Sequence, residues 1–129
     1  MKICPASLAA LFLLCTLGCV TPVTPEQIAS ADYGTVPDPQ IYQNAVKDYM
    51  EGVLFDPYTA RYRFVGEPQK SYVYLSGTRK PPVFGYLVQV EINAKNLWGN
   101  YMGEQPFRFF IKNEMLYPLS KSEKAEVVQ

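Results

Sequence analysis

Few side chains in this sequence of 129 residues are suited to catalysis. The chain has no histidine, which removes the commonest metal ligand and the side chain best suited to general acid–base catalysis near neutral pH. Glu91, Glu104 and Glu114 lie near one predicted loop, and two carboxyl groups about 5 to 9.5 Å apart can hydrolyse a glycosidic bond. Because charged residues on the wet face of a sheet are usually only solvated, we predict that the protein is not an enzyme.

Other catalytic and metal-binding patterns have no better support. Ser71 and Ser76 have no recognisable base, and nothing indicates a buried site that would activate Lys95. Gly99 and Gly103 do not open a helix, so they do not form a phosphate-binding loop. The sequence also lacks the spacing of a calcium-binding loop. We therefore predict no catalytic residue, no metal site and no cofactor.

The strongest candidate for a binding site is the segment 94–106, AKNLWGNYMGEQP, between two predicted strands. Gly99 and Gly103 permit tight or left-handed backbone, and aromatic and methionine side chains in a long loop are typical of binding hot spots. The candidate binding residues are Lys95, Asn96, Trp98, Tyr101 and Met102. The competing interpretation is that Trp98 folds back to cap an open end of the sheet, while its polar neighbours only stitch the turn. Both interpretations stay open.

The N-terminus has the form of an export signal. After Met1 and Lys2, the uncharged run Ile3–Leu17 has about 15 residues, short of the roughly 20 that cross a ~30 Å hydrocarbon layer as a helix. The segment Thr16-Leu17-Gly18-Cys19 resembles the lipobox of bacterial lipoproteins, although its threonine and leucine depart from the usual residues. The alternatives are an uncleaved span and an ordinary secretory signal in which Cys19 is incidental.

The lipobox resemblance implies that residues 1–18 are removed and that Cys19 becomes an acylated first residue. Several acyl chains together hold a protein on a bilayer far more firmly than one. Because Val20 rather than aspartate follows Cys19, similarity to sorted enterobacterial lipoproteins favours the outer membrane, with the domain facing the periplasm. Cys4 and Cys15 lie in the removed segment, so no disulfide is expected.

Net charge argues against two kinds of partner. The chain has 12 basic and 12 acidic residues and a pI near 6.2, which removes the attraction behind most nonspecific nucleic-acid binding. Loss of Lys2 with the signal leaves 11 basic and 12 acidic residues, a net charge of −1 without a polybasic patch for lipid headgroups. We expect membrane contact through the lipid anchor alone and no nucleic-acid partner.

Residues 19–37 separate the anchor from the folded part. They are rich in proline and poor in bulky apolar side chains, which favours a flexible tether. The alternative is that Ile28 to Tyr33 docks on the domain as an extra helical turn.

One convincing helix is predicted from Asp38 to Phe55. Asp38 is a good N-cap, Pro39 suits the first helical position, and the following Asp56-Pro57 ends the helix. The predicted core stripe comprises Tyr42, Val46, Tyr49 and Val53, with Ala45 and Met50 beside them.

Downstream, the apolar period changes from 3.6 to 2, which indicates strands. Strands are predicted near residues 60–64, 72–75, 83–93, 107–111 and 115–119. Arg61 and Arg63 give the first of them a basic outer face, and 83–93 has the length of a central strand with one wet face. We therefore predict a single α+β domain over residues 38–119, with one N-terminal helix on a four- or five-stranded antiparallel sheet, and a frayed polar tail over 120–129.

The region from Asp56 to Lys112 resembles a family of small, uncharacterised bacterial lipoproteins. The matching segments are Asp56-Pro57-Tyr58-Thr59-Ala60-Arg61-Tyr62-Arg63, Gly85-Tyr86, and Asn93-Ala94-Lys95-Asn96 leading to Gly99, Tyr101, Gly103 and Pro106. The resemblance supports the lipoprotein class and implies no particular activity or catalytic residue.

Two functions follow as hypotheses. The favoured one is a noncatalytic, membrane-anchored protein-interaction module of the bacterial envelope, acting as an accessory subunit of an envelope or secretion assembly or as an inhibitor or immunity factor. Anchoring raises the effective concentration of such a module near membrane partners. The alternative is a lipoprotein that binds a small ligand or glycan by stacking it on Trp98 and Tyr101.

Overall fold

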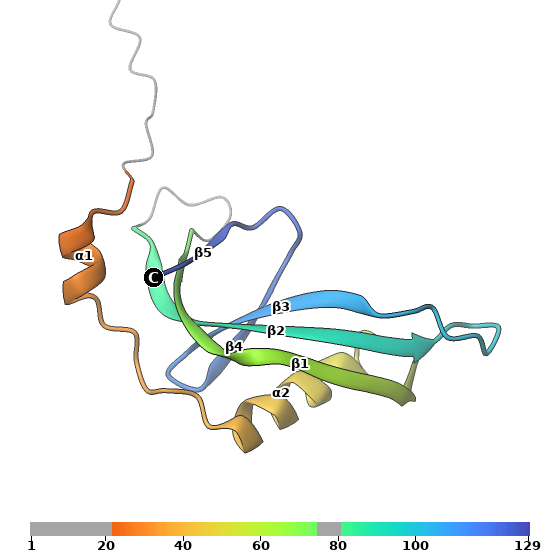
Figure 1. Ribbon diagram of the computed structural model, residues 1–129. Coiled ribbons are helices and arrows are strands. Elements are labelled where there is room, and N and C mark those ends of the chain that lie inside the picture. The colour runs from red at the N-terminus through yellow and green to blue at the C-terminus, as the bar shows by residue number, and fades with distance from the viewer. Residues whose placement is uncertain (1–21, 75–80) are drawn as a thin grey trace, which may run out of the picture.

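The computed structural model describes residues 22–74 and 81–129 (Figure 1). Its elements are the helices α1 (Pro25–Ser30) and α2 (Pro39–Glu51) and the strands β1 (Asp56–Val73), β2 (Val83–Lys95), β3 (Gln105–Lys112), β4 (Met115–Leu119) and β5 (Ala125–Val127). The strands form one antiparallel sheet in the order β4-β3-β2-β1-β5. The α+β class and the antiparallel sheet are confirmed. The sheet curls into a half-barrel, which the sequence did not indicate. The predicted signal peptide and Cys19 lie outside the described residues.

The start of α2 is confirmed, and its predicted end is wrong. The Asp38 carboxylate accepts hydrogen bonds from the backbone N–H groups of Gln40 and Ile41, and Pro39 occupies the first turn. The helix ends at Glu51 rather than at Phe55, because the next residues close a tight turn in which the Gly52 N–H donates to the Tyr49 carbonyl.

The face that α2 turns to the sheet is rotated from the predicted one. The side chains it buries are Tyr42, Val46 and Met50, which are 6%, 0% and 0% exposed. Tyr49 and Val53 are 41% and 50% exposed, so their placement in the core was wrong. Successive residues are about 100° apart around a helix, so the buried stripe is centred on Val46, and Tyr49, about 60° from that centre, lies at its rim. Val53 lies beyond the helix end.

The two strands predicted between residues 60 and 75 are one long strand, β1. Between Val65 and Gln69, residues 66–68 of β1 stand opposite the single residue Val88 of β2. Gly66 has a φ of +68°, which suits such a bulge. Residues 65–71, which were assigned to neither predicted strand, belong to this continuous strand.

The central position predicted for residues 83–93 is confirmed, because β2 pairs with β1 on one side and β3 on the other. Its buried residues on the α2 side are Tyr86, Val88, Val90 and Ile92. The opposite face is wet only in part: Gln89 is exposed, whereas Leu87 and Gly85 are buried. A Cβ atom on Gly85 would lie 2.4 Å from the Ile111 carbonyl oxygen, so the curled end of the sheet accepts only glycine there.

Part of the predicted tether belongs to the folded domain. Tyr33 is buried, with its ring edge-on to Phe84 and Tyr86 at centroid distances of 5.6 and 6.4 Å. This burial raises the pKa of Tyr33. Pro37 is also buried, and Lys112 forms an ion pair with Asp32 at 3.5 Å. This docking is close to the alternative interpretation, in which residues 28–33 dock on the domain as a helical turn. The helical turn itself, α1, lies just upstream of Tyr33 and buries no residue.

The polar tail contains a strand, contrary to the expectation that it frays. Residues 71–73 of β1 pair with β5. The Tyr72 hydroxyl donates to the Glu126 carboxylate, and this hydrogen bond together with burial raises the pKa of Tyr72 to about 12. The Arg108 guanidinium secures the β4–β5 connection by donating to the carbonyls of Ser120 and Glu123 at 3.2 and 2.9 Å. Pairing with β1 and polar contacts hold β5 in place. Because β5 does not depend on an apolar face, its sequence lacks the alternation that would have predicted a strand.

We predict that Met50→Ala lowers the free energy of unfolding by about 3 kcal/mol, because it empties a fully buried site. Tyr49→Ala is the matched control at the adjacent, half-exposed position, and we expect it to cost less. Denaturant unfolding of both variants measures the difference. A larger loss for Tyr49→Ala would show that α2 faces the sheet with its other side.

Candidate functional site

The β2–β3 connection forms the far end of the sheet and projects beyond α2 (Figure 1). Its two arms are held together close to the tip. Lys95 and Tyr101 form an isolated antiparallel bridge, and the Met102 N–H donates to the Ala94 carbonyl at 3.3 Å. The Gly103 N–H donates to Oδ1 of Asn93 at 3.1 Å. The segment is therefore an ordered extension of the β2–β3 hairpin.

Asn96 closes the turn at the tip. Its Oδ1 accepts hydrogen bonds from the N–H groups of Trp98 and Asn100, each at 3.0 Å. Its backbone N–H donates to the Asn100 carbonyl, and its carbonyl accepts from the Gly99 N–H. Asparagine side chains commonly bond to backbone ahead of them in turns, and Gly99 supplies the positive φ of +79° that this turn needs. The side chain of this candidate binding residue thus stitches the turn, as the competing interpretation proposed.

Trp98 does not fold back onto the sheet. It is 79% exposed, and its neighbours Leu97 and Met102 are exposed as well. The interpretation of Trp98 as a cap is therefore wrong. Asn96 closes the turn without help from the indole, which leaves the aromatic ring in solvent.

Tyr101 and Lys95, two further candidate residues, form a cluster with Arg61 of β1. The Tyr101 hydroxyl donates to the Thr59 carbonyl at 3.2 Å, which fixes the ring against the start of β1. The Arg61 guanidinium lies 4.5 Å and the Lys95 ammonium 5.4 Å from the ring centroid, within the range of cation–π attraction. The ring is thus already engaged by two cations.

Two carboxylates near this end contact the same arginine. Glu91 and Glu104 both form ion pairs with Arg63, the second at 3.2 Å, on an exposed part of the sheet. The basic outer face predicted for the first strand is therefore partly neutralised. Glu114 does not lie near the loop as expected, because it belongs to the two-residue β3–β4 turn at the opposite end of β3.

Sequence reasoning missed two apolar side chains that belong to the same end. Phe55 and Tyr58 are both exposed, and the pairing of Asp56 with Lys95 places them beside the hairpin. Phe55 had been assigned to the helix, so its exposure carried no signal in the sequence. We define the hairpin-end surface by the exposed apolar residues Phe55, Tyr58, Leu97, Trp98 and Met102.

Exposed apolar side chains concentrate at this end. Fourteen large hydrophobic side chains are exposed among the described residues, and seven of them are Val53, Phe55, Tyr58, Leu97, Trp98, Tyr101 and Met102. Clusters of this kind on a soluble surface mark contact sites more often than single exposed residues do.

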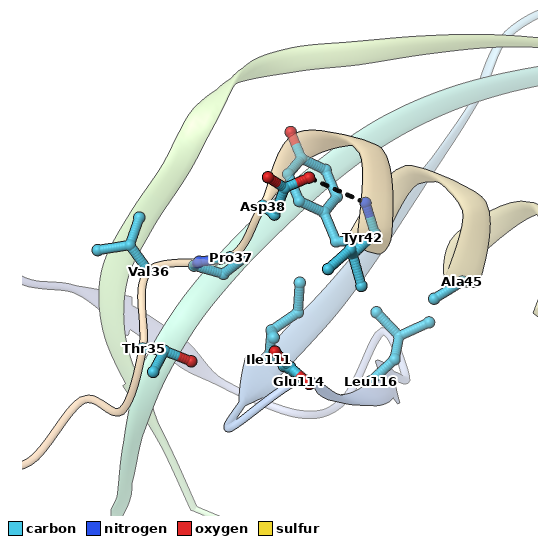
Figure 2. A pocket seen from close by; sticks show the side chains of 10 residues that line it. Thr35, Val36, Pro37, Asp38, Tyr42, Ala45, Ile111, Glu114 and Leu116 are labelled. Atoms are coloured by element: carbon cyan, nitrogen blue, oxygen red, sulfur yellow. Dashed lines mark hydrogen bonds between the residues drawn. The ribbon is translucent and has the colours of Figure 1, made fainter.

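Two hollows of the described structure lie away from Trp98 and Tyr101. A groove of about 670 Å³ on the face away from α2 is lined by residues that include Val65, Gln89, Arg108 and Lys121. Figure 2 shows a pocket of about 80 Å³ where Val36 and Pro37 meet the first turn of α2 and Leu116. Neither includes Trp98 or Tyr101.

No protein-family model, curated protein or solved structure matches this chain. Within residues 22–74 and 81–129, no helix has the length and apolar character to span a membrane. The same residues contain no group of three or more cysteine or acidic side chains placed to hold a metal ion. The fold and site thus define a small α+β half-barrel with an exposed apolar hairpin end, and the resemblance to lipoproteins stays a prediction.

We predict that Asn96→Ala loosens the tip while leaving the domain folded. The Trp98 and Asn100 amides lose their acceptor, and a hydrogen bond worth about 1 kcal/mol corresponds to an exchange rate roughly five- to tenfold faster. Hydrogen exchange followed by NMR measures this. Asn100→Ala is the control, since that side chain makes no hydrogen bond within the described structure. Unchanged exchange at both amides would contradict the assigned role of Asn96.

Proposed function

We propose that this chain is a noncatalytic, lipid-anchored protein-interaction module of the bacterial envelope, and that it docks on an envelope protein through the hairpin-end surface. The observation that carries the proposal is the exposure of Trp98 between Leu97 and Met102 on a turn fixed by Asn96. Tryptophan is enriched among residues that dominate binding energy. A turn that is already ordered also reduces the entropy lost on binding.

The position of this surface supports the proposal. In Figure 1, α1 and the hairpin lie at opposite ends of the sheet. Cys19, the proposed lipidated residue, lies three positions before Pro22, where the described chain begins. A lipid at Cys19 would therefore place the hairpin on the side away from the anchoring bilayer. With Val20 after the cysteine, we place the protein on the outer membrane, facing the periplasm.

Two roles fit such a module: an accessory subunit of an envelope or secretion assembly, and an inhibitor or immunity factor. In both, the anchor confines the module and its partner to one surface, so that a small interface suffices for stable docking. The exposed apolar side chains supply that interface without any catalytic group.

The alternative, stacking of a small ligand or glycan on Trp98 and Tyr101, has less support. Arg61 and Lys95 already occupy the Tyr101 ring, which leaves one free aromatic platform. Small ligands usually bind in a concave site that covers most of their surface, and the described hollows do not include Trp98.

We predict that Cys19→Ala prevents lipidation and releases the protein from membranes, because the anchor is the proposed membrane contact. Acyl labelling and fractionation of cells that express both forms test this. Unchanged fractionation with no acyl label in either form would rule out the lipoprotein assignment.

We predict that a photo-crosslinking residue at position 98 of the lipidated protein captures one envelope protein in living cells. The matched control is position 36, where Val36 is equally exposed but lies outside the hairpin. Changing Leu97 and Met102 to serine should lower the yield, because both are exposed members of the hairpin-end surface. Equal capture from positions 36 and 98 would remove the hairpin from the proposal. A shift of Trp98 fluorescence on adding cell-wall fragments, with no protein captured, would favour the glycan alternative.

A further inference from the structure

The straight part of β1 has an open edge. From Arg61 to Val65 it pairs in regular register with β2. On its other side β5 reaches only residues 71–73, so no strand of the described chain covers the edge over residues 59–65. An uncovered edge presents unpaired backbone N–H and C=O groups to any extended segment that approaches it.

The opposite edge of the sheet is protected. β4 has only five residues, and Pro118 within it has no N–H to donate. By contrast, residues 59–65 contain no proline, and the two register shifts of β1, at 57–60 and 66–68, leave residues 61–65 in regular register between them. The edge of β1 next to the hairpin is therefore the one suited to strand addition.

Two cations that form no ion pair within the described chain lie near this edge, Arg61 on β1 itself and Lys95 at the end of the neighbouring β2. Arg61 and Lys95 lie over the Tyr101 ring, and neither makes an ion pair with any described residue. Arg63, two positions along the strand, is balanced by Glu91 and Glu104. Arg61, Lys95 and Arg63 carry three positive charges against the two carboxylates of Glu91 and Glu104, an excess of one, and Asp56, the register partner of Lys95, makes no ion pair with it. The aromatic ring holds both cations in place before any partner arrives.

We propose that the partner docks by adding an extended acidic segment to the edge of β1, with a carboxylate at Arg61 and Lys95 and an apolar side chain against Trp98. This inference rests on the proposed function and names the chemistry of the partner. In strand addition, main-chain hydrogen bonds supply affinity and alternate side chains supply specificity. Here the cation cluster selects the charge, and the hairpin-end surface selects the apolar residue.

A second copy of this chain fits the edge less well. In the antiparallel register centred on Tyr62, Arg61 of each copy would stand opposite Arg63 of the other. Like charges directly opposite each other destabilise a strand pair. An anionic membrane would contact the same cations and Trp98 but would leave the backbone N–H groups of the β1 edge unpaired. Hydrogen exchange at that edge therefore distinguishes a membrane from a protein segment.

The test uses the full chain in detergent and an acetylated nonapeptide that alternates glutamate with threonine and valine. Hydrogen exchange of residues 59–65 is the readout, and we expect it to slow at least tenfold. One control peptide carries lysine in place of glutamate. The other keeps the acidic sequence but has every backbone nitrogen methylated. Neither control should protect the edge. The double variant Arg61→Glu, Lys95→Glu should prefer the lysine peptide. Lys121→Glu with Lys124→Glu makes the same charge change elsewhere and should keep the original preference.

Three results would overturn the inference. In the first, the acidic and lysine peptides protect the edge equally. In the second, the acidic peptide gives no protection at residues 59–65. In the third, sedimentation shows a dimer whose β1 edge is protected without any peptide. Binding of the Cys19→Ala chain to phosphatidylglycerol vesicles, lost on Trp98→Ser, would also overturn it and assign the surface to a membrane.

Capture from position 98 in cells separates this inference from the proposed function. If the double variant Arg61→Glu, Lys95→Glu still captures the same protein at full yield, the acidic-strand inference fails and the interaction module stands. If the unaltered protein captures nothing from position 98, the proposed function itself fails.

Discussion

The bulge in the pairing of β1 with β2, in which three residues of β1 stand opposite one residue of β2, determines where the other parts of the molecule lie. Residues 66–68 opposite Val88 lengthen β1 locally, and the strand bends there. Beyond the bend, residues 71–73 meet β5 and the sheet closes into a half-barrel. Before the bend, residues 61–65 of β1 pair in regular register with β2, and a second register shift at residues 57–60 follows toward the hairpin. One face of the curled sheet closes over α2, and the other stays open as a groove.

The hairpin end combines a polar framework with apolar side chains that the framework leaves in solvent. Asn96 closes the turn, and Tyr101 ties it to β1 through Thr59 and Arg61. None of these bonds uses the Trp98 side chain, so selection for folding alone does not explain an exposed indole there. Burying such a residue on a partner recovers the hydrophobic free energy that folding leaves unused.

The elements that the sequence predicted well are those determined by local pattern, and the elements it missed depend on distant pairing. The cap at Asp38 and the alternation in β2 were sufficient for α2 and the central strand. The continuity of β1 and the existence of β5 depend on partners far along the chain, and Tyr33 docks on residues more than fifty positions away. The sequence singled out the segment 94–106 as a candidate site, and its use in binding stays a prediction. The exposure of Trp98 could not be predicted, because the two possible roles of Asn96, closing the turn or contacting a partner, looked alike in the sequence.

The docking of Tyr33 also determines how the domain would respond to tension. Tyr33 rests on Phe84 and Tyr86 near the first residue of β2, and the hairpin turn follows the last residue of that strand. A pull between the N-terminal side and a partner held at Trp98 therefore acts along β2. Antiparallel hydrogen bonds lie perpendicular to the strands, so such a pull shears the ladders with β1 and β3 on both sides of β2, and many bonds share the load. Peeling from one edge would break them singly. In that geometry, unfolding would require several ladder hydrogen bonds to break together.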